Sequence, residues 1–362
     1  MKPVSTATAT DARRKKRSAR FVDIAAEAGV SIATVNRVLN DHGSVSAATR
    51  ERVLRAAKQL AVPRVLPDTR RGLTRFDVVL ADSDTPFLRR LDFALRQYSQ
   101  WLDRRIVVHR HSFDPQDDPR TARFIARPPH RRDGLLLAVH DTPDIRHAVQ
   151  AVIEQGVPVV TLMSDIGDVA RLHYAGIDNY RAGRSAGYFM GRFTQRSGRV
   201  VVLTNDLGFR AHRDRTGGFL AAVADHFPRL ECLAIQACHD DPRRVHDAVR
   251  QALAAPGGAD VVGLYHSGAG SAGAAQALQD SGRAGDVVWI GHELSDEHRG
   301  FIRAGLMDLV IDQDPDGQVL SAMQHLLHAS QWADQRPPSG PNEFRLFFAE
   351  NLIERPYLPA GL

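Results

Sequence analysis

The 362-residue chain has few of the features that mark secreted, disulfide-bonded or membrane proteins. Its two cysteines, Cys232 and Cys238, lie six positions apart on an expected strand, where their side chains would share a face but sit too far apart for easy bridging. We expect two free thiols, as in a reducing cytoplasm. No run of about 18 apolar residues occurs, so neither a transmembrane helix nor a membrane partner is expected. The N-terminus has no apolar signal region, which also favours a cytoplasmic location.

The chain also lacks the short motifs of several enzyme classes. It contains no H-E-x-x-H and no C-x-x-C sequence. The pairs at His109-x-His111 and His239-Asp240-Asp241 could bind a metal, but a chain with 16 histidines produces such pairs readily. We interpret both as structural or solvated, and we predict no catalytic residue, metal or cofactor.

Charge is distributed unevenly along the chain. Residues 1–75 hold 16 Lys and Arg against six Asp and Glu, whereas the remainder holds 31 against 36. A basic head on a mildly acidic body is typical of proteins whose head binds nucleic acid. Residues 1–20 could be a basic disordered tail, but the basic excess continues into patterned sequence.

Residues 21–61 predict three short helices. The first covers 22–28, a turn follows at Gly29-Val30, and Ser31 is a suitable N-cap for a second helix over 32–39. Ser46 is a suitable N-cap for a third helix over 47–60. Helix, glycine-containing turn and helix is the helix-turn-helix plan, in which the second helix enters the major groove of DNA. A generic three-helix bundle with a solvated polar face is the alternative.

The polar face of the second helix carries the expected DNA contacts. Arg37 can donate two hydrogen bonds to a guanine edge, and Asn36 can bind adenine or a phosphate. Ile32 and Ala33 can contact a thymine methyl group. The residues expected to contact DNA are Ser31, Ile32, Ala33, Thr34, Asn36, Arg37 and Asn40.

Residues 22–60, VDIAAEAGVSIATVNRVLNDHGSVSAATRERVLRAAKQL, closely resemble the headpiece of the lac repressor (LacI/GalR) family. Asn36 departs from that family, which usually has Ser there, and this bears on base preference. The linker over residues 62–75 departs further, since Pro63 and Pro67 interrupt the stretch where the family folds a hinge helix against the minor groove. It is either such a hinge or a basic linker that contacts phosphates.

From residue 76 to 362 strand and helix patterns alternate, which predicts an α/β core with parallel sheets covered on both faces. The resemblance extends here and implies the two-lobed core of periplasmic binding proteins, with crossovers near residues 195 and 313. The expected strands are 76–81, 105–109, 134–139, 157–162, 174–177, 200–204, 232–237, 261–265, 287–291 and 309–311.

In such sheets a ligand binds at the carboxyl ends of the strands, between the lobes. The loops there carry carboxylates, an arginine, amides and an aromatic ring, which suit a sugar or polyol. By the family pattern Arg215, His266, Glu293 and Gln313 stand at effector-contact positions, with His266 and Glu293 replacing the commoner Asn and Asp. The expected effector-binding residues are Asp84, Phe87, Asp141, Arg215, His266, Glu293 and Gln313.

A second interpretation rests on Gly268-x-Gly270-x-x-Gly273, which follows an expected strand and opens a helix, as in a dinucleotide-binding fingerprint. It would make the protein an NAD(P)-dependent oxidoreductase. The loop lies late in the chain, however, and that function leaves the basic head unexplained. Small residues also occur where a helix packs closely on a sheet.

The sequence thus predicts a sequence-specific regulator, by family habit a repressor, that binds a palindromic double-stranded DNA operator as a homodimer. A small sugar-like effector would change the spacing of the two heads by closing the lobes. A DNA-binding regulator without small-molecule control is a third possibility, given the atypical linker and the substitutions at His266 and Glu293.

Overall fold

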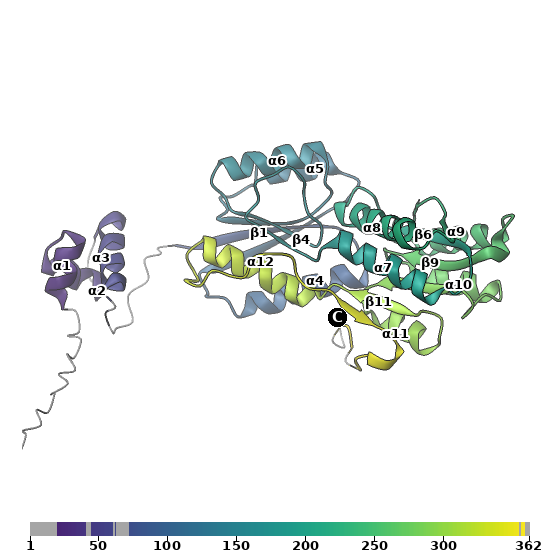
Figure 1. The fold of residues 1–362 in the computed structure, drawn as a ribbon. Coiled ribbons are helices and arrows are strands. Elements are labelled where there is room, and N and C mark those ends of the chain that lie inside the picture. The colour runs from purple at the N-terminus through teal and green to yellow at the C-terminus, as the bar shows by residue number, and fades with distance from the viewer. Residues whose placement is uncertain (1–19, 41–44, 61, 63–71, 355, 359–362) are drawn as a thin grey trace, which may run out of the picture. The chain divides into compact units, whose positions relative to one another are not determined.

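The computed structural model describes residues 20–40, 45–60, 62, 72–354 and 356–358. The chain divides into two compact units, residues 1–73 and 74–362 (Figure 1). Almost all of the expected tail over 1–20, and most of the linker over 62–75, lie outside the described residues. The second unit begins two residues earlier than expected, because Thr74 and Arg75 already pair with Ile106 and Val107 in a sheet. Among the described residues, no helix combines the length and hydropathy needed to cross a membrane.

The first unit is the three-helix bundle that the sequence predicts. It consists of α1 (Phe21–Ala28), α2 (Ile32–Leu39) and α3 (Ala47–Gln59). Gly29 ends α1 in a left-handed conformation, φ 63°, and the hydroxyls of Ser31 and Ser46 accept hydrogen bonds from Thr34 N and Thr49 N. The apolar faces meet in one core, formed by Ile24, Ala25, Ala28, Val35, Val38, Leu39, Val53, Leu54, Ala56 and Ala57.

The second unit has two lobes, each built on a mainly parallel sheet. The first lobe contains β1 (Thr74–Ala81), α4 (Pro86–Gln100), β2 (Ile106–Phe113), α5 (Asp118–Ala126), β3 (Gly134–Ala138), α6 (Pro143–Glu154), β4 (Val159–Leu162) and β5 (His173–Ala175). Its strand order is β2-β1-β3-β4-β5, all parallel. Helices α5 and α6 cover one face and α4 covers the other (Figure 1).

The second lobe holds a larger sheet with the order β12-β11-β10-β9-β6-β7, and β8 also pairs with β6. Its elements are α7 (Asn179–Phe193), β6 (Gly198–Thr204), α8 (Arg210–His226), β7 (Leu230–Cys232), β8 (Gln236–Ala237), α9 (Pro242–Ala254), η1 (Gly258–Asp260), β9 (Val261–His266), α10 (Ser271–Asp280), β10 (Val288–His292), α11 (Asp296–Arg303), β11 (Leu309–Asp312), β12 (Arg345–Phe347) and η2 (Ala349–Asn351). Helices α7 and α8 pack on one face, and α9, α10 and α11 pack on the other.

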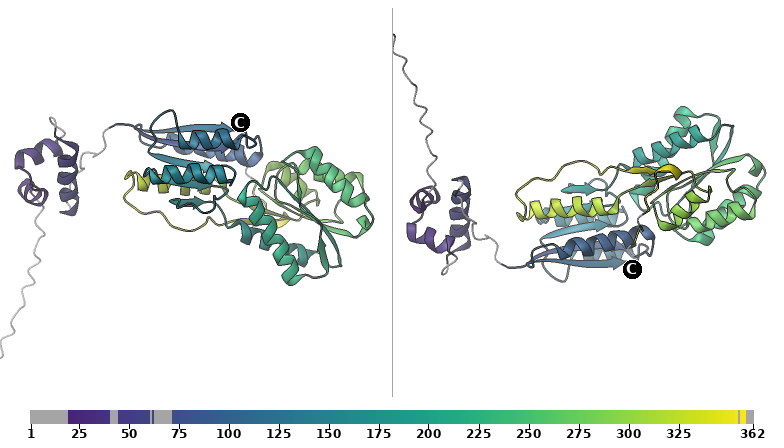
Figure 2. Two further views of the ribbon diagram at one scale, coloured as in Figure 1. Left: turned by 90° about the horizontal axis from the view of Figure 1, so that it is seen from above. Right: turned by 90° about the horizontal axis from the view of Figure 1, so that it is seen from below.

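Three segments connect the lobes. The chain first crosses between β5 and α7, earlier than the expected position near residue 195, because Ala182, Ala186 and Met190 of α7 are buried in the second lobe. It returns after β11, near the expected residue 313, into α12 (Pro315–Ala329), which packs beside α4 on the first lobe (Figure 2). A third crossing, which the sequence did not suggest, leads to β12. Asn342 N donates to Gly176 O at 2.8 Å, so the first and third crossings lie side by side.

The expected strand over 232–237 is two short strands, because a residue is inserted into its pairing with β6. Val200 pairs with Cys232 and Leu203 pairs with Gln236. An advance of three residues along β6 therefore matches an advance of four residues from β7 to β8. The extra residue interrupts the ladder as a bulge does. The two cysteines therefore belong to separate stretches, and both are free thiols.

Helices α7 and α8 lie unusually close to one another because glycines line their interface. A Cβ atom built on Gly183 would stand 2.0 Å from Arg215 O, and one on Gly218 would stand 2.1 Å from Tyr180 O. No real side chain fits at such distances. This contact fixes the start of α7 against the turn of α8 that carries Arg215.

Replacing Gly218 with Ala is therefore expected to destabilise the second unit by about 1–3 kcal/mol, since the helices must separate to admit the methyl group. Gly217 is the matched control, because it is the adjacent residue in α8 and a Cβ there meets nothing within 4 Å. Gly217→Ala should leave stability unchanged or raise it by roughly 0.5–1 kcal/mol. Chemical denaturation of both variants measures the difference, and equal midpoints would refute the close-packing argument.

Candidate functional site

A cleft of about 250 Å³ opens between the two lobes of the second unit. It lies at the carboxyl ends of the strands, where the loops of both sheets converge. The first lobe contributes residues after β1 and β2, and the second contributes residues after β6, β8, β9, β10 and β11. The lining includes Asp82, Ser83, Phe87, Gln116, Asn205, Asp206, Phe209, His212, Arg215, His239, Asp240, Ser267, His292, Glu293, Glu297, His298 and Gln313.

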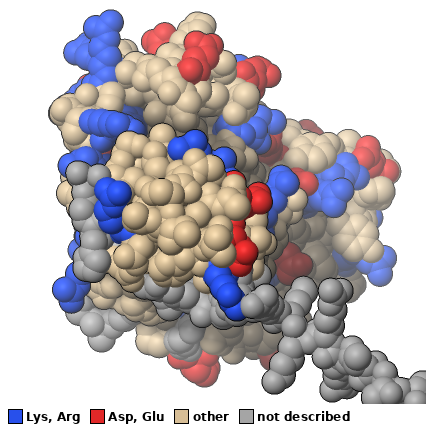
Figure 3. All heavy atoms as spheres, turned by 90° about the vertical axis from the view of Figure 1, so that its left-hand side faces the viewer, with Lys and Arg blue, Asp and Glu red and all other residues tan. Residues whose placement is uncertain are grey.

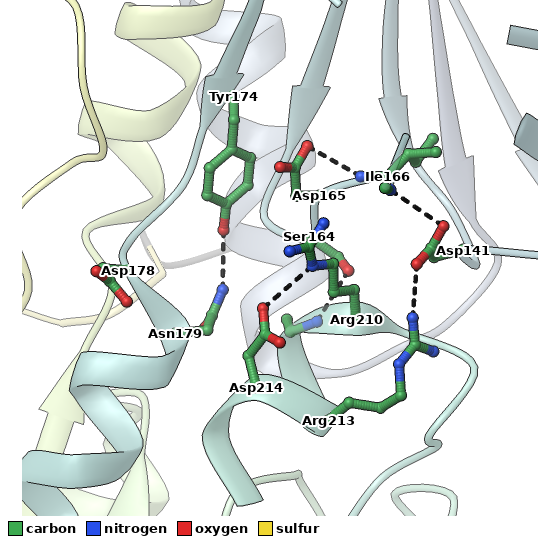
Figure 4. A network of polar contacts seen from close by, with 12 residues as sticks. Asp141, Ser164, Asp165, Ile166, Tyr174, Asp178, Asn179, Arg210, Arg213 and Asp214 are labelled. Carbon is green, nitrogen blue, oxygen red and sulfur yellow. Dashed lines mark hydrogen bonds and ion pairs between the residues drawn. The ribbon is translucent and has the colours of Figure 1, made fainter. Parts of the chain in front are cut away.

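Arg215 is the buried cation of this cleft. Its Nε donates to Asn179 Oδ1 at 2.7 Å, and its Nη1 lies 3.3 Å from Ser267 O. Both acceptors are neutral, and burial lowers the pKa of the guanidinium. Asn179 is the first residue of α7, and its Nδ2 donates to Tyr174 Oη at 2.8 Å (Figure 4). Arg215 is thus held by the first interlobe crossing.

Glu293 follows β10 in a left-handed conformation, φ 71°, which a non-glycine residue rarely adopts. Gln313 Nε2 donates to its Oε1, and Tyr357 Oη donates to its Oε2 at 3.3 Å. Burial, aided by the neighbouring Asp312 carboxylate, raises the pKa of Glu293 to about 8, against the opposing effect of Arg215. Glu293 is therefore mostly protonated at neutral pH.

Four histidines surround the second-lobe side of the cleft, and burial lowers the pKa of each. His292 Nε2 lies 2.9 Å from Tyr265 Oη, and His298 Nε2 lies 2.7 Å from Ser271 Oγ. His212 also lines the cleft. All four imidazoles are consequently neutral hydrogen-bonding groups at pH 7.

Two polar atoms of buried lining residues have no hydrogen-bond partner within the described part of the chain. They are His292 Nδ1 and Gln313 Oε1, on side chains that are 1% and 3% exposed. An unsatisfied buried polar atom costs free energy unless a ligand or water contacts it. Beside them, Phe87 and Phe209 provide apolar surface. The cleft therefore suits a small ligand with both hydroxyl groups and apolar faces.

The structure brings together four of the seven expected effector residues, Phe87, Arg215, Glu293 and Gln313, in this lining. His266 lies behind the loop, with Nδ1 3.3 Å from Ser271 Oγ, and is outside the lining. Asp84 is exposed near the mouth, 3.6 Å from the Arg89 guanidinium.

Asp141 also lies outside the lining, because two arginines occupy its carboxylate. Arg146 Nε donates at 2.6 Å, and Gly167 N donates at 3.2 Å. Arg213 Nη2 also donates at 2.6 Å (Figure 4). Burial alone would raise the pKa of Asp141, but these bonds hold it below the usual value. Arg213 belongs to the second lobe, so Asp141 connects the lobes instead of facing the cleft.

Other contacts also join the lobes around the cleft. Asp141 N donates to Gly208 O at 3.0 Å, and Ala211 N donates to Ser164 Oγ at 3.1 Å. Gln116 Nε2 also donates to Asp206 Oδ2 at 3.2 Å, two residues before Gly208. The lobes are therefore in contact along the loop after β6 and the start of α8.

Sequence reasoning missed Phe209, His212, Asp206 and Asp240 as lining residues. Phe209, Asp206 and Asp240 lie in loops after strands, which is the general signal for a cleft residue, and His212 lies in the first turn of α8. The sequence carried no indication of which loop residues turn inward. For Asp240 that direction follows from two consecutive left-handed residues, His239 at φ 52° and Asp240 at φ 57°.

The glycines of the 268–273 loop are explained by contacts within the chain. A Cβ on Gly268 would lie 2.9 Å from Asp240 Oδ1, and one on Gly273 would lie 1.8 Å from Pro242 O. The Asp240 carboxylate also accepts a hydrogen bond from Ala269 N at 2.7 Å, next to the amino end of α10. The position where a dinucleotide would place its pyrophosphate thus already faces a carboxylate. Among the described residues no group of three or more His, Cys, Asp or Glu could hold a metal ion.

In the first unit, α2 presents the face expected to contact DNA. Ser31, Ile32, Ala33, Asn36 and Arg37 are exposed, and Thr34 and Asn40 are partly exposed. The second helix of the bundle thus has an apolar inner face and an outer face that is free of other described elements. In the face of the molecule drawn in Figure 3, Lys and Arg are spread among uncharged side chains, and Asp and Glu form smaller groups.

Comparisons with known proteins agree with both units. The protein family described as "Periplasmic binding protein domain" matches residues 123–331, and the family described as "Bacterial regulatory proteins, lacI family" matches residues 21–61. The chain is 24% identical over 219 residues to the HTH-type transcriptional regulator DegA of Bacillus subtilis, covering 59% of this chain and 64% of DegA. It is 30% identical over 185 residues to the ribose import binding protein RbsB of Salmonella typhimurium, covering 50% and 60%.

The fold is also that of solved sugar-binding proteins. GanP, a glucose-galactose binding protein from Geobacillus stearothermophilus, superposes with a TM-score of 0.69 at 19% identity, over 78% of this chain and 99% of GanP. Fold and cleft together define a periplasmic-binding-protein-like domain preceded by a helix-turn-helix headpiece. The chain belongs to the family of proteins with a periplasmic binding protein domain, and its residues 21–61 match the lacI family of bacterial regulatory proteins. It spans less than two thirds of the length of DegA and RbsB.

The raised pKa of Glu293 predicts a specific dependence of stability on pH. The folded state keeps the proton up to about pH 8, whereas the unfolded chain releases it near pH 4.5, so stability falls as pH rises between these values. Glu293→Gln removes the ionisable group and therefore this loss of stability. The loss amounts to about 1.4 kcal/mol for each unit by which the folded and unfolded pKa values differ. Denaturation at pH 5 to 8.5 should show the variant gaining stability over the wild type, and a constant difference would refute the raised pKa.

Tyr357→Phe tests the cause of the Glu293 pKa. Loss of the hydroxyl removes a hydrogen bond that favours the carboxylate, so the pKa of Glu293 should rise further. The pH-dependent loss of stability of Tyr357→Phe, measured against the Tyr357→Phe/Glu293→Gln double variant, should then continue to a higher pH than the corresponding loss in the wild type. Tyr188→Phe, at an exposed position on α7, is the matched control and should leave the profile unchanged.

Proposed function

We propose that this protein is a cytoplasmic DNA-binding transcriptional regulator, acting as a repressor, whose affinity for DNA is set by a small sugar, polyol or sugar derivative. The observation that carries the proposal is a cleft with buried, unpartnered hydrogen-bonding groups in a chain that begins with an exposed helix-turn-helix face. DegA is named as a transcriptional regulator and RbsB as a ribose import binding protein, which supports the same pairing of activities.

A homodimer would place one α2 helix in each half of a palindromic operator, through the residues given above for its exposed face. The effector would bind between the lobes and contact Arg215, Glu293, Gln313 and Phe87. The interlobe bonds, such as Asp141 to Arg213, are then the contacts that must rearrange if the lobes open and close. Differential binding to the open and closed arrangements would couple the effector to the DNA.

The first test is DNA binding by the full chain, on sites selected from a random duplex pool. Arg37→Ala should weaken binding to the selected site by about 5- to 150-fold, as expected for loss of a bidentate base contact worth roughly 1–3 kcal/mol. Arg55→Ala is the matched control, because Arg55 is an exposed arginine of α3 paired with Glu51. Fluorescence anisotropy measures both, and equal losses for the two variants would argue against direct base contact by Arg37.

The second test is a thermal-shift screen with pentoses, hexoses, polyols, sugar acids, sugar phosphates and NAD(P). A sugar-like compound at about 100 times its Kd should stabilise the protein by about 2.7 kcal/mol. Arg215→Lys should reduce this shift strongly, because an ammonium cannot contact Asn179 and the ligand together. Gln313→Ala is a second variant if the first unfolds. Stabilisation by NAD(P) alone would instead support the oxidoreductase interpretation.

A further inference from the structure

Carboxyl groups greatly outnumber cations in the cleft. Among the described lining residues the acidic side chains are Asp82, Asp206, Asp240, Glu293 and Glu297, and the arginine is Arg215. The four buried or partly buried histidines discussed above are neutral, because burial lowers their pKa values. The remaining lining histidine here, His239, lies 3.5 Å from Asp206 Oδ2. Even with Glu293 protonated and His239 beside Asp206, the other carboxylates of the lining outnumber Arg215.

Asp240 is a largely buried carboxylate with a single hydrogen bond. Its Oδ1 accepts from Ala269 N, and within the described part of the chain Oδ2 has no hydrogen bond. Burial and the nearby Asp206 carboxylate raise the pKa of Asp240 to about 6. Burial opposes ionisation of Asp206, but hydrogen bonds from Gly208 N and Gln116, and the His140 and His239 rings at 3.7 Å and 3.5 Å from its Oδ2, hold its pKa below the usual value. Two acids therefore face the same side of the cleft.

The cleft also offers neutral partners for hydroxyl groups. His292 Nδ1 and Gln313 Oε1 are unpartnered within the described residues, and Phe87 and Phe209 add apolar surface to the lining. The volume of about 250 Å³ lies below the usual range of about 300–1,000 Å³ for pockets of drug-sized ligands. These dimensions favour a ligand of one sugar ring or a short polyol chain.

The side of the cleft that holds Asp240 disfavours an anionic ligand group. A phosphate or carboxylate would be expected at the amino end of α10, but Asp240 already accepts the Ala269 N–H bond there. Bringing a second anion beside Asp240 and Asp206 would add like-charge repulsion in a poorly hydrated site. A cation at the same place would instead be attracted by both carboxylates.

From these contacts we propose that the effector is a polyol carrying a cationic amino group, such as an amino sugar, with its ammonium bound by Asp240 in the field of Asp206 and its hydroxyls by His292 and Gln313. This inference rests on the proposed function, because it specifies the ligand class of the same cleft. It also predicts proton release on binding below about pH 6, since an ammonium stabilises the Asp240 carboxylate.

The test compares matched probes on the full chain by calorimetry at pH 7.5. For the gluco, galacto and manno series the probes are the hexose, its 2-amino-2-deoxy derivative and its uronic acid. One amino sugar should bind at least tenfold more tightly than its parent hexose, and its uronic acid should bind more weakly than the parent. Binding of that amino sugar at pH 5.5, measured in buffers of different ionisation enthalpy, should release protons.

Asp240→Asn is the diagnostic variant, because the amide oxygen can still accept from Ala269 N while the charge is lost. It should abolish the preference for the amino sugar, so that the amino sugar and its parent hexose bind this variant with affinities within about twofold of each other. Asp84→Asn is the matched control at an exposed position near the mouth and should keep the preference. Melting curves confirm that each variant is folded.

The other outcomes separate the two proposals. Tighter binding of a parent hexose or a uronic acid than of every amino sugar would overturn the amino-group inference and leave a sugar effector in place. An unchanged preference in Asp240→Asn would overturn the role of Asp240. If no probe of any class binds, both the inference and the proposed sugar effector fail.

Discussion

The arrangement of the cleft depends on the burial of one guanidinium, that of Arg215, between neutral acceptors. Burying a charge is costly unless hydrogen bonds compensate it. Here the compensation comes from Asn179 at the first interlobe crossing and from the Ser267 carbonyl after β9. Both must therefore stay in place for Arg215 to stay buried. This requirement ties the crossing, the start of α7 and the loops of the second sheet into one unit.

The close approach of α7 and α8 makes this arrangement possible. At Gly183 and Gly218 each helix contacts the backbone of the other, next to the turn of α8 that carries Arg215. A ligand that contacts Arg215 is consequently connected to the first interlobe crossing through the hydrogen bond from Arg215 to Asn179. Such a contact links occupancy of the cleft to the relative position of the lobes, which is the coupling that an effector-controlled regulator needs.

Much of the fold could be predicted from the sequence because the signals are local. The N-caps at Ser31 and Ser46 and the apolar faces of the three helices need no distant residue, and both caps are confirmed. The alternating strands and helices of the core are equally readable. The early crossing was missed because α7 is amphipathic and can pack on either lobe. Its assignment depends on glycine contacts with α8 that no local pattern reveals.

The candidate site was less predictable, for reasons that particular residues illustrate. Arg215 and Gln313 follow the family pattern and line the cleft. Asp141 looked equally suitable as a loop carboxylate, but Arg146 and Arg213, five and 72 positions away, occupy it. Asp240 was interpreted, together with His239 and Asp241, as structural or solvated, and it lines the cleft because His239 and Asp240 adopt left-handed conformations. The direction of a loop side chain depends on backbone conformation and on contacts with residues distant in the sequence, so local sequence patterns do not predict it.

The position of α12 has a consequence for how the chain acquires its structure during synthesis. The core of the first lobe includes Val319, Ala322, Met323 and Leu326, although its sheet is complete at Ala175. When the ribosome has made that sheet, the apolar face that α12 will cover is still open to solvent. At about 5–20 residues per second this exposure lasts on the order of ten to thirty seconds. The nascent first lobe is therefore a substrate for chaperones until the last helix emerges.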